Sequence, residues 1–396
     1  MVSVILRQYY KNTELLLCIF RRMDFLNRFG FIANAGHTKK QRTHRKHQIP
    51  PNKTVKNAKH IKQKMTCSPH SANIKPSYLH DTCYTPAILE HIKTEYNKSL
   101  KTPKRGTSEG VRGITEDGVS SNGIHPAKIR TNDPTKIWKE LDKRLSHCNK
   151  EDCWLNQIRD PKLRKQIDRY MFAPDQPYEW KRNPNEWLSN YDILNVLEQY
   201  ELVYPNFEFI GPTPIDFDTR LGGESNAYNI GNERKPPEGA AAGKKCVWND
   251  LCHFSVKEKM REKKTKIGII FNLDKHDESG SHWVSLFVDM KRRFLFYFDS
   301  AGGDMPPEIQ RLIHRIQSQA KELQFRFKEY TNGNHDHQKG NTECGMYSLF
   351  FIVTMLTGKH TPTSKKMPLR KILDLFLHGN IPDKTMEDYR DEYFNA

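Results

Sequence analysis

The chain has 396 residues, of which 36% are hydrophobic and 11% aromatic, so it can bury a substantial core and is not disordered throughout. Residues 1–150 hold 29 of the 64 Lys+Arg but only 11 of the 47 Asp+Glu, so the net charge of +17 comes from the N-terminal part. The apolar run between Glu14 and Arg21 has six residues, where a membrane span needs about 20, so we expect no membrane partner.

Residues 1–130 form a basic N-terminal region that we expect to be largely disordered. Between Gly36 and Met65 it carries ten basic residues, no acidic residue and no apolar periodicity. Lys/Arg tails bind phosphate backbones without reading sequence, so this region predicts non-specific DNA binding. A tail that is only solvated is the alternative.

The ordered part begins with helical spacing of apolar residues over 135–150. We interpret residues 131–180 as a helical extension of a domain at 181–396, with a Gly- and Pro-containing insertion at 222–245. In that domain we expect a helix from Trp187 capped at Ser189 or Asn190, a helix over 306–323 and an apolar helix over 345–356. The expected strands are 267–272, 283–288, 294–298 and 325–330. This order predicts an α+β fold with a central hairpin.

The eight cysteines are scattered and show no regular disulfide framework. We therefore expect reduced thiols in a cytosol-like compartment. The group His147, Cys148 and Cys153 could hold a metal, but it lacks the usual close cysteine pair and a second ligand pair, so we assign no metal. Cys246 and Cys252 border the insertion and are interpreted as plain thiols.

His282 and Asp299 flank the hairpin formed by the second and third expected strands. If the turn is symmetric and Asp289 pairs with Arg292, the same register places His282 opposite Asp299, with Cβ atoms roughly 4.5–5.5 Å apart. A carboxylate there would fix the tautomer of the imidazole and stabilise its charged form. An ordinary cross-strand pair is the alternative.

Cys344 lies at the expected start of the last apolar helix, after a loop in which Asn341 or Thr342 can cap that helix. Free N–H groups and the helix dipole favour a thiolate there. Gln338, one loop upstream, could donate a hydrogen bond to a developing oxyanion. Gly345 has no side chain, so substrate or a neighbouring strand could approach it closely. A buried core cysteine is the alternative.

These residues together resemble the ubiquitin-like-protein protease family, which includes SUMO and adenoviral proteases. Its members carry His-Trp, an Asp seventeen residues later, and a Gln six residues before Cys-Gly. This sequence has His282-Trp283, Asp299, Gln338 and Cys344-Gly345 in that order and spacing. The sequence from Trp187 to Asn190 is similar to the family's Trp-Leu-Asn-Asp motif, with Ser and Asn as its last two residues.

The resemblance implies a papain-like cysteine protease core of the SUMO-protease type, in which a central mixed sheet is flanked by helices. It implies a nucleophile at Cys344, a base at His282 oriented by Asp299, and an oxyanion donor at Gln338. It also implies a protein substrate with a Gly-Gly cleavage site, threaded between Trp187 and Trp283, and no cofactor. The alternative for both tryptophans is a place in the core.

The run from Glu343 to Ile352 and the segment Glu151–Leu155 resemble large-DNA-virus members of the family. That resemblance implies processing of capsid or core polyproteins during maturation, in the virion and the host cytoplasm; a cellular protein would be nuclear or cytoplasmic. The alternatives are an isopeptidase that removes SUMO or ubiquitin from host conjugates, and a non-catalytic DNA-binding scaffold. The sequence Arg220-Leu-Gly-Gly-Glu could be a self-processing site.

Overall fold

The structure is a computed structural model that describes residues 64–100, 127–220, 246–361 and 364–396. The predictions for residues 36–63, for the insertion at 222–245 and for a cleavage site after Gly223 lie outside these residues. The chain divides into two compact units, and the division falls between Phe172 and Ala173, apart from residues 68–70, which group with the second unit.

The first unit is helical, and three of its helices begin in the same way. In each, a residue with an oxygen-bearing side chain caps the first turn and a proline occupies the first helical position, where its missing N–H has no cost. The caps are Thr85, Asp133 and Asp160. The helices are α2 (Pro69–Ile74), α3 (Pro86–Ser99), α4 (Pro134–Arg144), η1 (Glu151–Gln157) and α5 (Pro161–Met171). Helices α2 and α3 lie within the stretch for which we expected largely disordered chain.

Three disulfides contradict the prediction of reduced thiols for six of the eight cysteines. The pairs are Cys67–Cys83, Cys148–Cys153 and Cys246–Cys252, with Cα–Cα distances of 5.1, 5.6 and 6.2 Å, within the range that a disulfide bridges. Their sequence separations of 16, 5 and 6 form no repeating pattern, so spacing alone could not reveal them. Among the described residues, Cys344 is the free cysteine.

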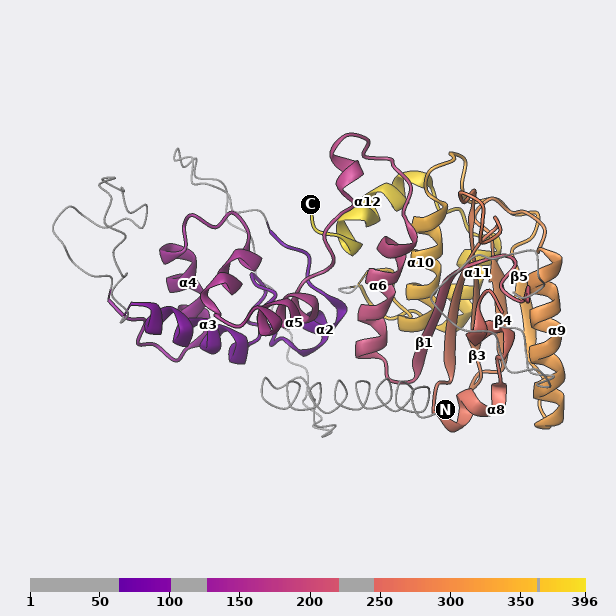
Figure 1. The fold of residues 1–396 in the computed structure, drawn as a ribbon, viewed down its shortest axis with the longest axis horizontal. Helices are drawn as coiled ribbons and strands as arrows, with labels where there is room; N and C mark the ends of the chain where they lie inside the picture. Colours follow the sequence, from indigo (N-terminus) through magenta and orange to yellow (C-terminus); the bar gives the residue numbers. More distant parts are fainter. Residues whose placement is uncertain (1–63, 101–126, 221–245, 362–363) are drawn as a thin grey trace, which may run out of the picture. The chain divides into compact units, whose positions relative to one another are not determined.

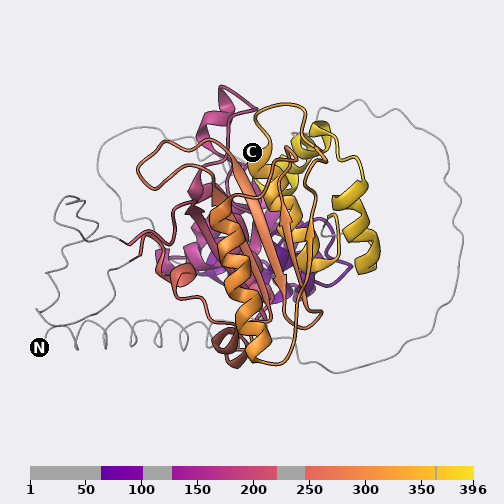
Figure 2. The same ribbon diagram turned by 90° about the vertical axis from the view of Figure 1, so that its right-hand side faces the viewer.

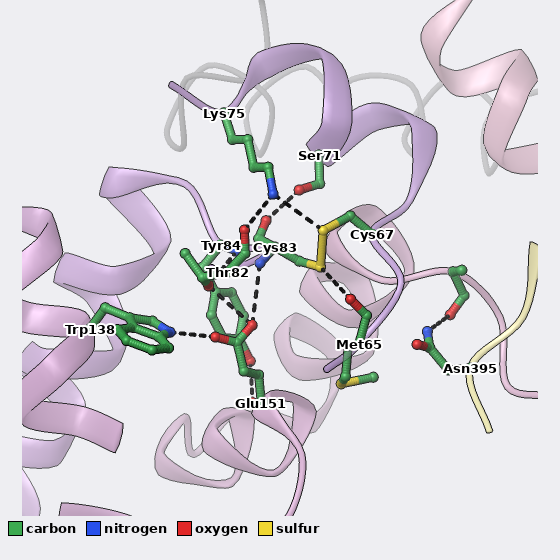
Figure 3. Close-up of a disulfide and its surroundings, with 11 residues drawn as sticks. Met65, Cys67, Ser71, Lys75, Thr82, Cys83, Tyr84, Trp138, Glu151 and Asn395 are labelled. Carbon is green, nitrogen blue, oxygen red and sulfur yellow. Dashed lines mark hydrogen bonds between the residues drawn. A yellow bond between two sulfur atoms is a disulfide. The ribbon is translucent and has the colours of Figure 1, made fainter. Parts of the chain in front are cut away.

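The Cys67–Cys83 disulfide lies beside a partly buried carboxylate, that of Glu151 (Figure 3). One carboxylate oxygen accepts hydrogen bonds from Thr82 Oγ1 at 3.1 Å and from the backbone N–H of Cys83 at 3.2 Å, and the other accepts one from Trp138 Nε1 at 2.5 Å. Burial raises the pKa of Glu151, although these donors oppose the rise. This network joins α4 and η1 to the segment that carries the disulfide.

The second unit is built on a five-stranded mixed sheet in the order β1-β2-β3-β4-β5 (Figure 1). β2, β3 and β4 are antiparallel neighbours, and β1 and β5 add in parallel at the two edges. The strands are β1 (Phe207–Pro214), β2 (Lys266–Asn272), β3 (Trp283–Asp289), β4 (Phe294–Phe298) and β5 (Lys328–Thr331). The sheet confirms the expected α+β architecture.

Helices cover both faces of this sheet, as Figures 1 and 2 show. Alternate residues of each strand point to opposite faces: in β3, Phe287 packs with α10 and α6, whereas Leu286 and Val288 pack with α9. The three central strands are therefore apolar along almost their whole length. The helices are η2 (Tyr178–Lys181), α6 (Asn190–Val203), α7 (Asn249–Cys252), α8 (Val256–Arg261), α9 (Pro307–Glu322), α10 (Cys344–Thr357), α11 (Leu369–His378) and α12 (Asp383–Tyr393).

The hairpin of β3 and β4 has a register different from the predicted one. Asp289 pairs with Phe294, not with Arg292, because residues 290–293 form a longer turn that ends in a left-handed backbone at Arg293 (φ 57°). The register therefore shifts by two residues. Such a shift leaves every side chain on the face that we predicted.

No helix within the described part of the chain is both long enough and apolar enough to cross a membrane.

Candidate active site

His282 and Asp299 meet at one end of the hairpin, although the predicted register is wrong. His282 directly precedes β3 and Asp299 directly follows β4, so both leave the sheet at the same end. In the observed register they are diagonal neighbours, which long side chains can bridge. The ring Nε2 of His282 lies 2.7 Å from Asp299 Oδ1, the geometry of a charge-assisted hydrogen bond.

Cys344 is the first residue of α10, which packs on the face of the sheet that includes Phe287. The expected caps are wrong: the residue at the cap position is Glu343, and it makes no side-chain capping bond. The first N–H groups of α10 therefore have no partner within the helix, and the helix presents its positive end beside the sulfur. The Cys344 side chain is near enough to His282 to raise the pKa of the imidazole, and because Nε2 faces Asp299, Nδ1 is the ring nitrogen left for the thiol.

The surroundings of His282 strongly favour its charged form. Burial alone would lower the pKa of the imidazole, but the hydrogen bonds and charges of Asp299 and Cys344 outweigh it and raise this pKa to about 10. An imidazolium between a carboxylate and a sulfur stabilises a thiolate. The arrangement is therefore one in which an imidazolium could activate a neighbouring cysteine for attack on carbonyl carbons.

Asn332 holds Asp299 in place, a role that the sequence did not reveal. Its carboxamide accepts from the backbone N–H of Asp299 at 3.0 Å and donates to the backbone oxygen of the same residue at 2.6 Å. The backbone N–H of Ala301 donates to Asp299 Oδ1 at 2.9 Å. The carboxylate that faces His282 is thus fixed from its own main chain and from the loop after β5.

Gln338 lies on the loop before α10, and its amide is oriented by a buried hydroxyl. Ser300 Oγ donates to Gln338 Oε1 at 2.7 Å, and Gln338 Nε2 donates to the backbone oxygen of Gly340 at 3.0 Å. An amide nitrogen has two hydrogens, so the second can face a substrate oxygen. Ser300 directly follows Asp299, so one turn of chain orients both the carboxylate and the amide.

The two tryptophans expected at the substrate path differ in exposure. Trp187 is 38% exposed, whereas Trp283 is 5% exposed and belongs to the core, where its Nε1 donates to the backbone oxygen of Leu188 at 3.3 Å. A Cβ on Gly345 would lie 3.1 Å from Leu188 Cβ and 3.3 Å from Trp283 Cδ1. Gly345 therefore lets the Trp187 segment lie directly against the start of α10.

Two groups of three residues could offer metal ligands within the described residues: His147 with Cys148 and Cys153, and His253 with Cys246 and Cys252. In both groups the two cysteines are joined as a disulfide, so neither offers free thiolates.

Residues 249–396 match the C-terminal catalytic domain of the Ulp1 protease family. This range includes His282, Asp299, Gln338 and Cys344, but it does not include Trp187. The chain is 33% identical to a protein of Acanthamoeba polyphaga mimivirus that is named as a thiol protease. The alignment spans 174 residues, which are 44% of this chain and 49% of the mimivirus protein. The chain thus spans about half the length of that relative.

The SUMO-1 cysteine protease of African swine fever virus is 27% identical over 258 residues, which are 59% of this chain and 86% of that protein. A crystal structure of the protease of the same virus is 24% identical in sequence. The match covers 66% of this chain and 90% of the crystallised chain, with a TM-score of 0.42.

Proposed function

We propose, from the match of residues 249–396 to the C-terminal catalytic domain of the Ulp1 protease family, that this chain is a thiol endopeptidase that cleaves after Gly-Gly-type sites. The observation that carries the proposal is the His282 ring, which hydrogen-bonds Asp299 and has a pKa raised by both Asp299 and the neighbouring Cys344. We propose that residues 181–396 form the catalytic domain and that residues 131–180 are its helical extension.

In the proposed reaction the Cys344 thiolate attacks the carbonyl carbon of the scissile bond. Gln338 and the free N–H groups at the start of α10 donate to the oxyanion of the tetrahedral intermediate. The His282 imidazolium then gives its proton to the leaving amine, and a thioester remains on Cys344. Water, deprotonated by His282, hydrolyses the thioester and restores the thiol. Protein side chains and backbone supply every step, without a cofactor.

The preference for glycine follows from crowding beside the nucleophile. Leu188 and Trp283 already fill the space at Gly345, and the exposed indole of Trp187 lies one residue from Leu188. A substrate residue with a Cβ would compete for this space, whereas glycine would not. A fluorogenic Gly-Gly-X peptide tests the proposal: wild type should cleave it, Cys344→Ala should not, and cleavage of a matched Ala-Ala-X peptide at an equal rate would refute the glycine preference.

We further propose that the natural substrates are viral capsid or core polyproteins, processed in the virion and the host cytoplasm. Both curated relatives named above are viral proteins. The competing function is removal of SUMO or ubiquitin from host conjugates, and the name of the swine fever virus relative, a SUMO-1 cysteine protease, favours it. Cleavage of SUMO with a C-terminal fluorogenic amide, with viral Gly-Gly-X peptides left intact, would select the isopeptidase.

DNA is the proposed second partner, bound through the basic N-terminal region. In the first unit, a hollow of about 360 Å³ is lined by five basic side chains and a single acidic one. Lys128 and Arg130 end the basic N-terminal region, and the other basic residues, Lys136, Lys139 and Arg144, follow it directly in the chain. A scaffold that only binds DNA would not need the intact catalytic constellation. Binding to duplex DNA should weaken steeply with salt in wild type and in Cys344→Ala alike; salt-independent binding, or none, would remove this partner.

A further inference from the structure

Glu343, the residue directly before the proposed nucleophile, carries a buried carboxylate. Its side chain is 3% exposed, and Thr342 Oγ1 donates to it at 3.1 Å. A negative charge beside a sulfur disfavours the thiolate, and a buried carboxylate without a partner is costly. We therefore expect a positively charged side chain next to Glu343 that neutralises its carboxylate.

Arg390 on α12 is that positive charge, and all three of its guanidinium nitrogens are engaged. Nη2 lies 2.7 Å from Glu343 Oε1, and Nε lies 3.2 Å from Oε2, so the carboxylate is held by two parallel bonds. Nη1 donates to the backbone oxygens of Pro184 at 2.8 Å and Glu186 at 3.1 Å. The guanidinium stacks 4.2 Å from the ring centre of Trp180, and only 7% of its side chain is exposed.

These contacts join two parts of the site that are far apart in sequence. The two carbonyl oxygens belong to the segment that leads directly into Trp187, the proposed wall of the substrate path. Trp180 Nε1 also donates to the backbone oxygen of Glu186, at 2.9 Å, so this segment is held from two directions. The carboxylate, in turn, belongs to the residue that starts α10, and α12 packs against α10 (Figure 1).

We propose that Arg390 is a positioning residue of the protease: it neutralises Glu343 beside the nucleophile and ties the Trp187 segment to the start of α10. The inference rests on the proposed function, because it assigns Cys344 as the nucleophile. Other charged groups also face the start of α10 from the elements packed around it. They are His282 before β3, Asp299 after β4, and Asp383 at the start of α12, which accepts from the backbone N–H of Gly340 at 2.7 Å.

The test is the pH dependence of alkylation of Cys344 by iodoacetamide, followed on the peptide that contains this residue. Arg390→Met leaves an uncompensated carboxylate, so the pH midpoint of alkylation should rise by about one unit. Glu343→Gln leaves an uncompensated guanidinium, so the midpoint should fall. The double variant removes both charges and should return the midpoint to within a few tenths of a unit of the wild-type value.

Lys384→Met is the matched control, since Lys384 is a 72% exposed cation on the same helix and forms its ion pairs with Glu387 and Asp388. The control should leave the midpoint unchanged. A buried ion pair with a purely structural role would lower the melting temperature of Arg390→Met and of Glu343→Gln without opposite shifts of their midpoints. That result, or a double variant that fails to restore the midpoint, would overturn the proposal. If Arg390→Met does not fold, the downward shift in Glu343→Gln decides it.

The second role of Arg390 is read from the kinetics of a Gly-Gly-X peptide. Arg390→Lys keeps the charge but cannot reach the carboxylate and both carbonyl oxygens together, so its alkylation midpoint should stay near wild type while KM rises about tenfold. An unchanged KM would remove the tie to the Trp187 segment. Alkylation of Cys344 needs no peptide substrate, so the two proposals can fail separately. If wild type cleaves no peptide, the proposed function fails. The pH midpoints of alkylation still decide whether Arg390 compensates the charge of Glu343.

Discussion

Replacement of Asp299 by asparagine tests how the His282 imidazole is activated. The carboxylate oxygen lies 2.7 Å from His282 Nε2, and the Asp299 side chain is only 5% exposed, so water cannot readily take over its role. A hydrogen bond to a charged group contributes about 1.5–3 kcal/mol, and each 1.36 kcal/mol is a factor of ten in rate. Asp299→Asn should therefore lower kcat/KM by about 10- to 150-fold.

The pH profile gives the sharper result for the same variant. In wild type the imidazolium should persist until its pKa of about 10, so the alkaline limb of kcat/KM should lie there. Without the carboxylate this pKa falls towards the ordinary 6.5, and the alkaline limb should move down with it. Asp250→Asn, an exposed position on α7, is the control. An alkaline limb that stays in place, with kcat/KM within twofold of wild type, would refute the assigned role of Asp299.

The other predictions concern the orientation of Gln338, the close approach at Gly345 and the pH dependence of stability. Ser300→Ala removes the hydroxyl that donates to Gln338 Oε1, so kcat should fall by about two- to tenfold with little change in KM in a peptide assay. A rise in KM with kcat unchanged would contradict this role of Ser300. Gly345→Ala places a Cβ 3.1 Å from Leu188 Cβ, so the melting temperature and kcat/KM should both fall, and a variant that keeps both would show that this contact has room. The pKa of His282 is higher in the folded chain, so its contribution to the free energy of unfolding should be complete below pH 6.5 and lost as pH rises towards about 10. Urea titrations of wild type should show this decrease, and Asp299→Asn should show much less of it.

The strands and the pair of His282 and Asp299 could be predicted because their signals are local. β2, β3 and β4 are short apolar runs, and the side on which each residue points depends only on the parity of the register. The longer turn at residues 290–293 moved the register by two and left that parity intact, so the histidine and the aspartate still meet.

Other features depend on contacts that no local pattern records. β1 was not predicted, because Gly211 and Pro212 interrupt its apolar run as they would in a loop, and only parallel pairing with β2 makes it a strand. Asn332 acts through the main chain of a residue 33 positions away, and Arg390 pairs with a carboxylate 47 positions away. The disulfides likewise join cysteines whose spacing has no regularity.

The most direct test of the account is covalent labelling by a thiol-reactive Gly-Gly vinyl sulfone, located by peptide mass spectrometry. Wild type should give one adduct, on Cys344; His282→Ala should be labelled much more slowly, and Cys344→Ala should give no adduct at this position. Total labelling that is equally fast in wild type and Cys344→Ala would contradict the assignment of Cys344 as the nucleophile.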